Sequence, residues 1–242
     1  MLDELMLIGA TALGLIILGF GIGLADRRNF HFGWLAVAAL LVIVNDAAVT
    51  RGFFSFRGLP GFDANSDWNW SGKILALAVS LAIAALPVFG WRNIGLTLRQ
   101  HQLRGALIVT VVLLVIYSTM AWFMGAGGGT RGELAFQLTM PGFEEEVFYR
   151  GLLLLALDRA FTGRLNIGGA AIGWSLPLNA LVFGLAHGLS VDHGVFGFNA
   201  LTFALPCIGT IPAVWLRSKT GSLVLPVVLH NVVNVLFVVL PL

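Results

Sequence analysis

The chain has 242 residues, of which 58% are hydrophobic and only 11% charged, and its formal net charge at pH 7 is +2. Soluble domains carry about 25% charged residues, so this composition excludes an ordinary soluble domain, and the dispersed basic residues give no footprint for nucleic acid. The single cysteine, Cys207, excludes an intrachain disulfide and a multi-cysteine zinc site. The apolar residues fall in long blocks, which is typical of a polytopic helical membrane protein.

The apolar blocks predict an all-α, polytopic integral membrane protein with about eight transmembrane helices, because most blocks reach the roughly 20 residues that span a bilayer. A helix satisfies its own backbone groups in lipid, and the alternating pattern of strands is absent. Without a linker or internal repeat, one membrane domain over residues 1–242 is expected. The blocks cover about residues 5–24, 33–49, 73–91, 105–126, 143–160, 171–188, 198–216 and 221–240.

Basic residues are concentrated in alternate connections between these blocks. Nine fall in one set of connections, and four, Arg51, Arg57, Lys73 and Arg131, fall in the other. Cytoplasmic loops carry an excess of Lys and Arg, so the first set predicts the cytoplasmic face and places both termini outside. The nine are Arg27, Arg28, Arg92, Arg99, Arg104, Arg159, Arg164, Arg217 and Lys219.

The fifth block opens with three glutamates in the stretch PGFEEEVFYRG. Charged groups at membrane depth are functional candidates, because they are costly to keep there. Glu146 and Arg150 are four residues apart, so they share a helix face and are expected to pair. Glu145 points about 100° away and is predicted to be the freer carboxylate, while Glu144 is expected nearer the interface and expendable. The alternative is an ordinary helix start, where acidic residues favour the first turn.

Two later blocks carry polar residues at helical spacing. In the sixth block, Asn179, Phe183 and His187 recur every four residues on one face, and in the eighth block His230 and Asn234 are four residues apart. A histidine near a helix end is also compatible with an interfacial or hydrogen-bonded position. A histidine and an asparagine in the middle of a span need polar partners, so the eighth block indicates a buried polar site.

The remaining polar residues at membrane depth have structural interpretations. Asn231 points away from the face of His230 and is expected to hydrogen-bond to another helix. Asn45 and Asp46 in the second block are likewise expected to bond to a neighbouring helix. Cys207 is interpreted as a small core residue rather than a nucleophile.

The helix directions are expected to bring the candidate groups together. Glu145 begins the fifth block and His187 ends the sixth, which runs the opposite way, so both lie toward the same membrane side; His230 and Asn234 are predicted to join them in one cavity. A carboxylate and an imidazole around one water form a general base, and imidazole and amide donors stabilise a tetrahedral oxyanion. This set predicts hydrolysis of an amide bond inside the bilayer.

Three motifs occur in order along the chain: EEVFYR fits EExxxR, FGLAH fits FxxxH and HNVVN fits HxxxN. Together they resemble the CPBP intramembrane protease family, which includes the Ras-converting CAAX-prenyl endopeptidases and the bacterial Abi proteins. The tracts IGLTLR and KTGSLVLPVVLHN also look like that family, so the resemblance covers roughly residues 90–240.

The resemblance implies an eight-helix fold, with N-terminal helices in residues 1–91 and the catalytic core in residues 92–242. It implies that Glu145 and His187 activate the water and that His230 and Asn234 stabilise the oxyanion. The supporting residues implied by the motifs are Glu146, Arg150 and Phe183.

The resemblance also implies a multi-pass hydrolase of the cell membrane. Its substrate would be a protein or peptide, lipidated or membrane-anchored, cut near its C-terminus. No cofactor is expected, because the sequence has no HExxH pair. Zinc bound by His187, His230 and a glutamate is the alternative, since the family was long called a metalloprotease family.

Two other classes of function stay open. A non-catalytic membrane scaffold or bacteriocin-immunity protein would keep the fold, although it needs no water-activating pair. A transporter would use Glu145, His187 and Asp46 as a proton relay, and inverted repeats would favour it, but the sequence shows none. Eukaryotic family members act on the cytosolic side, whereas the charge distribution here places Glu145 nearer the outside.

Overall fold

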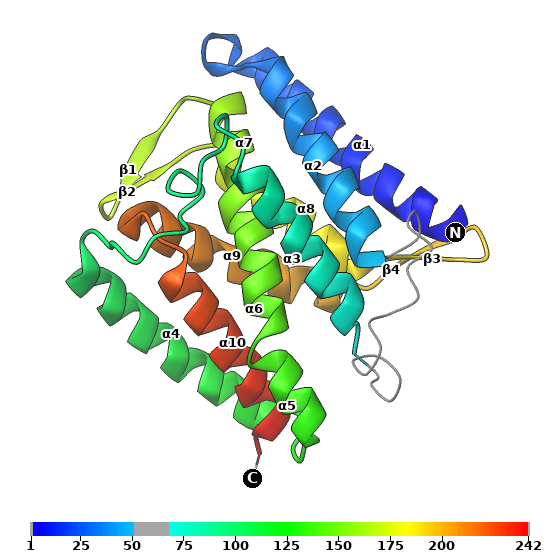
Figure 1. Ribbon diagram of the computed structural model, residues 1–242, viewed down its shortest axis with the longest axis vertical. Coiled ribbons are helices and arrows are strands. Elements are labelled where there is room, and N and C mark those ends of the chain that lie inside the picture. Colours follow the sequence, from blue (N-terminus) through cyan, green and yellow to red (C-terminus); the bar gives the residue numbers. More distant parts are fainter. Residues whose placement is uncertain (1, 51–67, 242) are drawn as a thin grey trace.

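The computed structural model describes residues 2–50 and 68–241 and is mainly helical (Figure 1). A π-helical segment, Glu146–Leu153, joins α6 to α7, and the 3-10 helix Arg27–Asn29 joins α1 to α2. Four short strands form two hairpins, β1 (Leu165–Ile167) with β2 (Ala170–Ile172) and β3 (Leu189–Asp192) with β4 (Val195–Phe198). The helices are α1 (Leu2–Ala25), α2 (Phe32–Thr50), α3 (Trp70–Ala84), α4 (Leu103–Met124), α5 (Arg131–Gln137), α6 (Met140–Glu145), α7 (Leu154–Ala160), α8 (Ser175–Gly188), α9 (Ala200–Thr220) and α10 (Val224–Val239).

The helical stretch from α6 to α7 runs through the middle of the molecule, with α1 and α2 on one side and α4 and α10 on the other (Figure 1). Pro141 stands in its first turn, where a missing backbone N–H costs nothing. It ends at Phe161, whose backbone is extended. The predicted fifth block, 143–160, is therefore confirmed as one continuous helical stretch, but its centre is π-helical rather than α-helical.

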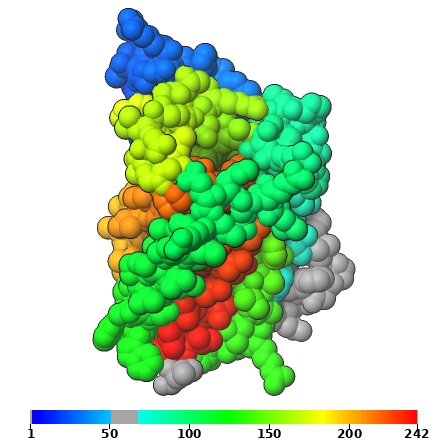
Figure 2. All heavy atoms as spheres, turned by 90° about the vertical axis from the view of Figure 1, so that its left-hand side faces the viewer, coloured from blue at the N-terminus to red at the C-terminus, as the bar shows by residue number. Residues whose placement is uncertain are grey.

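The central stretch is buried because it is packed on several sides. α2 and α3 contact it from the N-terminal part of the chain, and α8, α9 and α10 contact it from the C-terminal part. The main apolar core lies along it and includes the fully buried Leu35, Phe148, Leu152 and Leu157. By contrast, α4 lies diagonally across one outer face (Figure 2), and its side chains Val111, Val115 and Phe123 are exposed. An exposed apolar helix surface is what a lipid environment requires.

Four of the described helices, α1, α2, α4 and α9, are long and apolar enough to cross a membrane. The chain is a polytopic, all-α membrane protein, as predicted. The predicted lengths of three blocks were too long. α3 ends at Ala84, shortly before Pro87, because proline cannot continue a helix. α10 starts only after Gly221, which has φ 73 and ends α9.

The two hairpins were not predicted from the sequence. The sixth helical block was predicted to begin at residue 171, but residues 170–172 pair with residues 165–167 instead, and α8 begins at Ser175. Each hairpin turns through two residues with positive φ, Gly168 (φ 59) with Gly169 (φ 89), and His193 (φ 50) with Gly194 (φ 79). Such turns match the twist of a hairpin. Strands of three or four residues are too short to show an alternating pattern.

The connections rich in basic residues meet at one end of the molecule, as the charge distribution predicted. Arg159 Nη1 donates a hydrogen bond to the carbonyl of Val88 (2.5 Å), and Arg217 Nη2 donates one to the carbonyl of Asn93 (2.7 Å). Lys219 contacts the carbonyl of Gly168 in the β1–β2 turn. We call this the basic end. Its assignment to the cytoplasmic face remains a prediction. Arg51 and Arg57, from the other set, lie outside the described residues.

Candidate functional site: a carboxylate cluster beside a membrane-embedded cavity

Two of the three glutamates share one lysine from another helix. Lys73 Nζ, on the first turn of α3, lies 2.6 Å from Glu144 Oε2 and 2.6 Å from Glu145 Oε1. The three side chains are largely shielded, with exposures of 15% for Lys73, 1% for Glu144 and 10% for Glu145. An ionised carboxylate is costly to bury unless it is paired, so Lys73 is what allows both groups to stay ionised side by side.

This contact corrects two predictions. Glu145 is not the freer carboxylate, because α3 brings Lys73 to it. Glu144 is neither near the interface nor a loose end of the cluster, since it is buried and bonded to the same ammonium. Lys73 was counted as a loop cation, but it belongs to a helix. The signal that could have found it is a lone cation at the start of an otherwise apolar block, which requires a buried anion.

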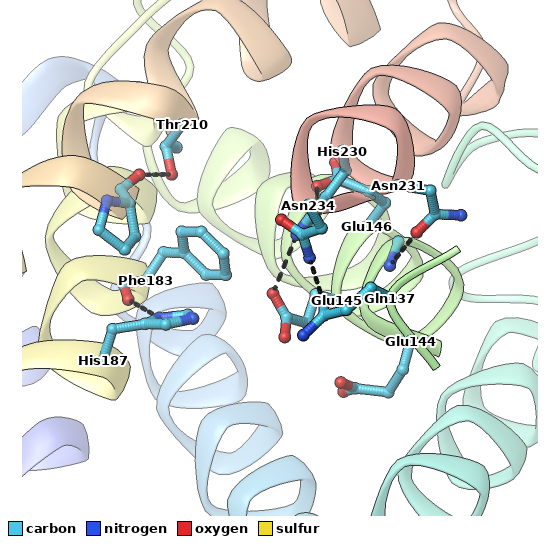
Figure 3. A network of polar contacts seen from close by, with 12 residues as sticks. Gln137, Glu144, Glu145, Glu146, Phe183, His187, Thr210, His230, Asn231 and Asn234 are labelled. Carbon is cyan, nitrogen blue, oxygen red and sulfur yellow. Dashed lines mark hydrogen bonds and ion pairs between the residues drawn. The ribbon is translucent and has the colours of Figure 1, made fainter. Parts of the chain in front are cut away.

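Glu146 forms a second network that stays within the later part of the chain. Its Oε2 lies 3.3 Å from Arg150 Nε, which confirms the predicted pairing four residues apart. Its Oε1 lies 2.7 Å from His230 Nδ1 (Figure 3). Arg150 is held in turn by Thr210, whose Oγ1 accepts a hydrogen bond from Nη2 (3.0 Å), and its guanidinium lies 4.2 Å over the ring of Phe183. These contacts fix the position and orientation of the imidazole.

His230 connects the two networks. While Nδ1 contacts Glu146, Nε2 lies 3.6 Å from Glu145 Oε2 on the other carboxylate. The described cluster contains three carboxylates and two permanent cations, Lys73 and Arg150. Buried charges are stable only when they are compensated. Lys73 and Arg150 compensate charge on both sides of the glutamate triplet, and His230 contacts one carboxylate on each side.

His187 approaches the same carboxylate from α8. Its Nδ1 lies 2.8 Å from the carbonyl oxygen of Phe183, one turn earlier. That carbonyl can only accept, so the proton sits on Nδ1 and Nε2 is left as an acceptor. Figure 3 shows the imidazole extending from α8 toward Glu145. His187 and Glu145 line the same cavity, with no direct hydrogen bond between them among the described contacts, which leaves room for a small molecule such as water.

The amide groups of α10 have separate roles. Asn234 Nδ2 donates to Gln137 Oε1 on α5 (2.9 Å), a partner that the sequence analysis missed. Asn231 Oδ1 accepts a hydrogen bond from the backbone N–H of Gly142 (2.8 Å), which confirms the predicted bond between helices. A Cβ at position 142 would lie only 2.2 Å from that oxygen. Glycine therefore permits α6 and α10 to approach closely enough to bring His230 to the glutamates.

A cavity of about 740 Å³ opens beside these groups. Glu145, His187, His230 and Asn234 all line it, so the structure brings together the four residues predicted to be catalytic. The supporting residues Glu146, Arg150 and Phe183 line it as well. Most of the remaining wall is apolar and comes from α4, α9 and α10, including Tyr117, Met120, Leu205, Leu229, Val233 and Phe237. A pocket of this size and lining fits a largely apolar ligand held by a few polar groups.

Some donor atoms of this site are engaged by other side chains. Within residues 2–50 and 68–241, no group of three or more His, Cys, Asp or Glu side chains is arranged to hold a metal ion. His230 Nδ1 is occupied by Glu146, and Glu145 Oε1 by Lys73. The mechanism proposed below assigns no step to a metal.

In this helical membrane protein, carboxylates and imidazoles from separate helices thus face one cavity. Residues 129–236 match the family model described as type II CAAX prenyl endopeptidase Rce1-like. This match covers all three motifs and confirms the resemblance to the CPBP and CAAX protease family over residues 129–236. No curated protein and no solved structure gave a match. α1, α2 and α3 lie outside the matched residues.

Proposed function

We propose that this protein cleaves a peptide bond of a membrane-associated protein or peptide near its C-terminus, using a water held between Glu145 and His187. The observation that supports this is the shared cavity, in which Glu145, His187, His230 and Asn234 face one space. Glu145 Oε2 is buried and accepts no hydrogen bond from the described residues. A carboxylate oxygen that accepts no hydrogen bond, with His187 lining the same cavity, can act as a general base.

In the proposed reaction, Glu145 Oε2 and His187 Nε2 both accept from one water, and one of them takes its proton. The water oxygen then bonds to the substrate carbonyl carbon, whose oxygen becomes an oxyanion. Asn234 donates to that oxygen, and so does His230 through Nε2 when both of its ring nitrogens carry a proton, because preorganised donors stabilise the charge as it develops. The C–N bond then breaks, and the leaving nitrogen takes up the proton. One water is consumed, and the products are a carboxylate and an amine.

The supporting residues hold this arrangement in place. Glu146 fixes the ring of His230 through Nδ1, which leaves Nε2 facing the cavity side of Glu145. Gln137 holds the amide of Asn234 through its Nδ2. The apolar wall of the cavity is suited to the lipidated or membrane-anchored segment that the family implies for the substrate. The cell membrane is the location that we propose for this reaction.

The direct test is cleavage of a quenched peptide by the protein reconstituted in detergent or liposomes. Glu145→Ala and His187→Ala should each remove detectable cleavage, because loss of a general base typically costs about 10²–10⁴ in rate. Asp192→Asn is the matched control, since the Asp192 side chain is 89% exposed and distant from the cavity. Cleavage at the wild-type rate by Glu145→Ala would overturn the mechanism.

Two further measurements separate the alternatives. Activity that survives exhaustive chelation supports the glutamate mechanism, whereas loss on chelation and recovery with Zn²⁺ supports the zinc alternative. A folded wild-type protein that cleaves no peptide or lipidated substrate would instead indicate the non-catalytic scaffold or immunity protein. A reporter fused after Leu242 determines which membrane side holds the C-terminus.

A further inference from the structure

A second cavity, of about 160 Å³, lies on the other side of the carboxylates. It is enclosed by α1, α2, α3, α6 and α8, and Lys73, Glu145 and His187 line both cavities. These three side chains therefore form the partition between the two spaces. The other polar residues of the second cavity are Thr11, Asn45, Asp46, Thr50, Glu144 and Tyr149.

The second cavity differs from the first in the chemistry of its wall. Asn45 Oδ1 and Glu145 Oε2 are both buried, and neither has a hydrogen-bond partner among the described residues. A buried polar atom without a partner is costly, and ordered water is the usual way to satisfy it. Cavities that stay empty are apolar, whereas a polar cavity with room for the solvent holds water. A water takes about 30 Å³ in the liquid, so this cavity has room for several.

When a substrate occupies the larger cavity, the water for hydrolysis has to come from another side, and the smaller cavity can supply it. The apolar wall of the larger cavity is suited to the substrate, and a seated substrate displaces the water there. Each turnover nevertheless consumes one water at Glu145. The smaller cavity reaches Glu145 and His187 from the opposite side and is too small for a peptide chain with its side chains.

We propose that the second cavity is a water chamber that supplies the hydrolytic water to Glu145 while the substrate occupies the larger cavity. This inference rests on the proposed function. It gives α1 and α2 a role, since they build much of the chamber and lie outside residues 129–236. Water held by Asn45 and Asp46 would pass between Lys73 and His187 to the free oxygen of Glu145.

The first experiment tests whether the chamber is wet and does not depend on catalysis. The chain has a single cysteine, so Cys207→Ala gives a cysteine-free background. In that background, Asp46→Cys places a thiol in the chamber, and Ile43→Cys places one on the outer surface of the same helix, where Ile43 is 37% exposed. A small charged methanethiosulfonate reacts with the thiolate, which forms only where water is present.

In liposomes, Asp46→Cys should react at least about 10-fold faster than Ile43→Cys, because the thiolate is the reactive form. The reaction should persist when a non-cleavable peptide analogue saturates the larger cavity. Equal labelling of the two thiols would show a dry chamber and overturn the proposal. Protection of Asp46→Cys by the peptide analogue would show that the two spaces are one, and would overturn it as well.

The second experiment introduces a larger apolar side chain into the chamber, so that less water fits there. Thr11 lines the second cavity and not the first, and its hydroxyl bonds to the carbonyl of Leu7 on its own helix. Thr11→Leu should lower kcat by about 10-fold and change KM by less than about two-fold, since substrate binding is untouched. Thr119→Leu, on the exposed side of α4, where the hydroxyl likewise bonds to its own helix, makes the same exchange outside both cavities and should retain the wild-type kcat.

The two experiments separate failure of this proposal from failure of the proposed function. If the wild-type protein cleaves nothing, the proposed function fails, but labelling of Asp46→Cys still decides whether the chamber holds water. If the wild-type protein cleaves and Thr11→Leu keeps its full kcat with a normal melting temperature, the supply of water from this side is wrong.

Discussion

The two sides of the glutamate triplet are held in different ways. Glu146 finds its partners, Arg150 and His230, inside the segment that matches the protease family. Glu144 and Glu145 depend on Lys73, which stands on α3 and outside that segment. The segment with the motifs therefore contains all the contacts that orient the imidazole of His230. It does not contain the cation that compensates the charge of Glu145, the carboxylate proposed to activate water.

This difference shows that the site extends beyond the segment that carries the three motifs. The N-terminal helices supply the ammonium for two glutamates and also enclose the second cavity. Residues 1–91, which we predicted simply as N-terminal helices, thus contribute to the chemistry through Lys73. The substitutions below probe each side of the triplet in turn.

The largest effect is expected for Arg150→Met, on the Glu146 side. Arg150 is 2% exposed, and its removal leaves Glu146 without its cation in the interior. Breaking a buried ion pair from one side typically costs about 3–5 kcal/mol, so the free energy of unfolding should fall by that order. A denaturation curve in mild detergent measures it. Arg150→Lys should recover part of the loss, and an unchanged curve for Arg150→Met contradicts the assignment.

A smaller loss of stability and a large loss of activity are expected for Lys73→Met, on the Glu145 side. Two carboxylates would then face each other without their shared cation. Because Glu145 would lose the cation that holds it, kcat should fall at least about 10-fold, and at most by the roughly 10²–10⁴-fold that a general base contributes. Lys73→Arg keeps the charge and should restore part of kcat. A purely structural role for Lys73 predicts less folded protein but an unchanged kcat per folded molecule.

An intermediate effect is expected for Glu144→Gln. The change removes one of the two anions that Lys73 neutralises but leaves Glu145 paired. We expect kcat to fall by less than about 10-fold, since only the surroundings of the base change and not the base itself. Quenched-peptide cleavage measures this fall, with Asp192→Asn as the exposed control. Complete loss of activity would instead make Glu144 the base.

The smallest effect is expected for Gln137→Ala, which releases the amide of Asn234. One hydrogen bond between uncharged groups contributes about 0.5–1.5 kcal/mol, so kcat should fall by no more than about 10-fold. Asn234→Ala should cost more, because it removes the proposed oxyanion donor itself. A double-mutant cycle of the two measures their coupling, and fully additive effects would contradict the contact.

The sequence was sufficient to predict most of the helical blocks and seven of the residues that line the cavity. Helical spacing predicted the Glu146–Arg150 pair and the shared face of His230 and Asn234, because both depend on positions within one helix. The role of Lys73 was not predicted, because a contact between residues 72 positions apart cannot be recognised from local periodicity. The hairpin between α7 and α8 was not predicted either, because strands of three residues are too short to show an alternating pattern of apolar and polar residues.

The close approach of α6 and α10 has a consequence for how such chains diverge. Any side chain at position 142 would place its Cβ 2.2 Å from Asn231 Oδ1, so a substitution there is compatible only with a smaller or shifted residue at position 231. Replacing Asn231 by a smaller residue frees space but leaves the Gly142 N–H without its acceptor. Among homologous chains, the two positions are expected to change together or not at all.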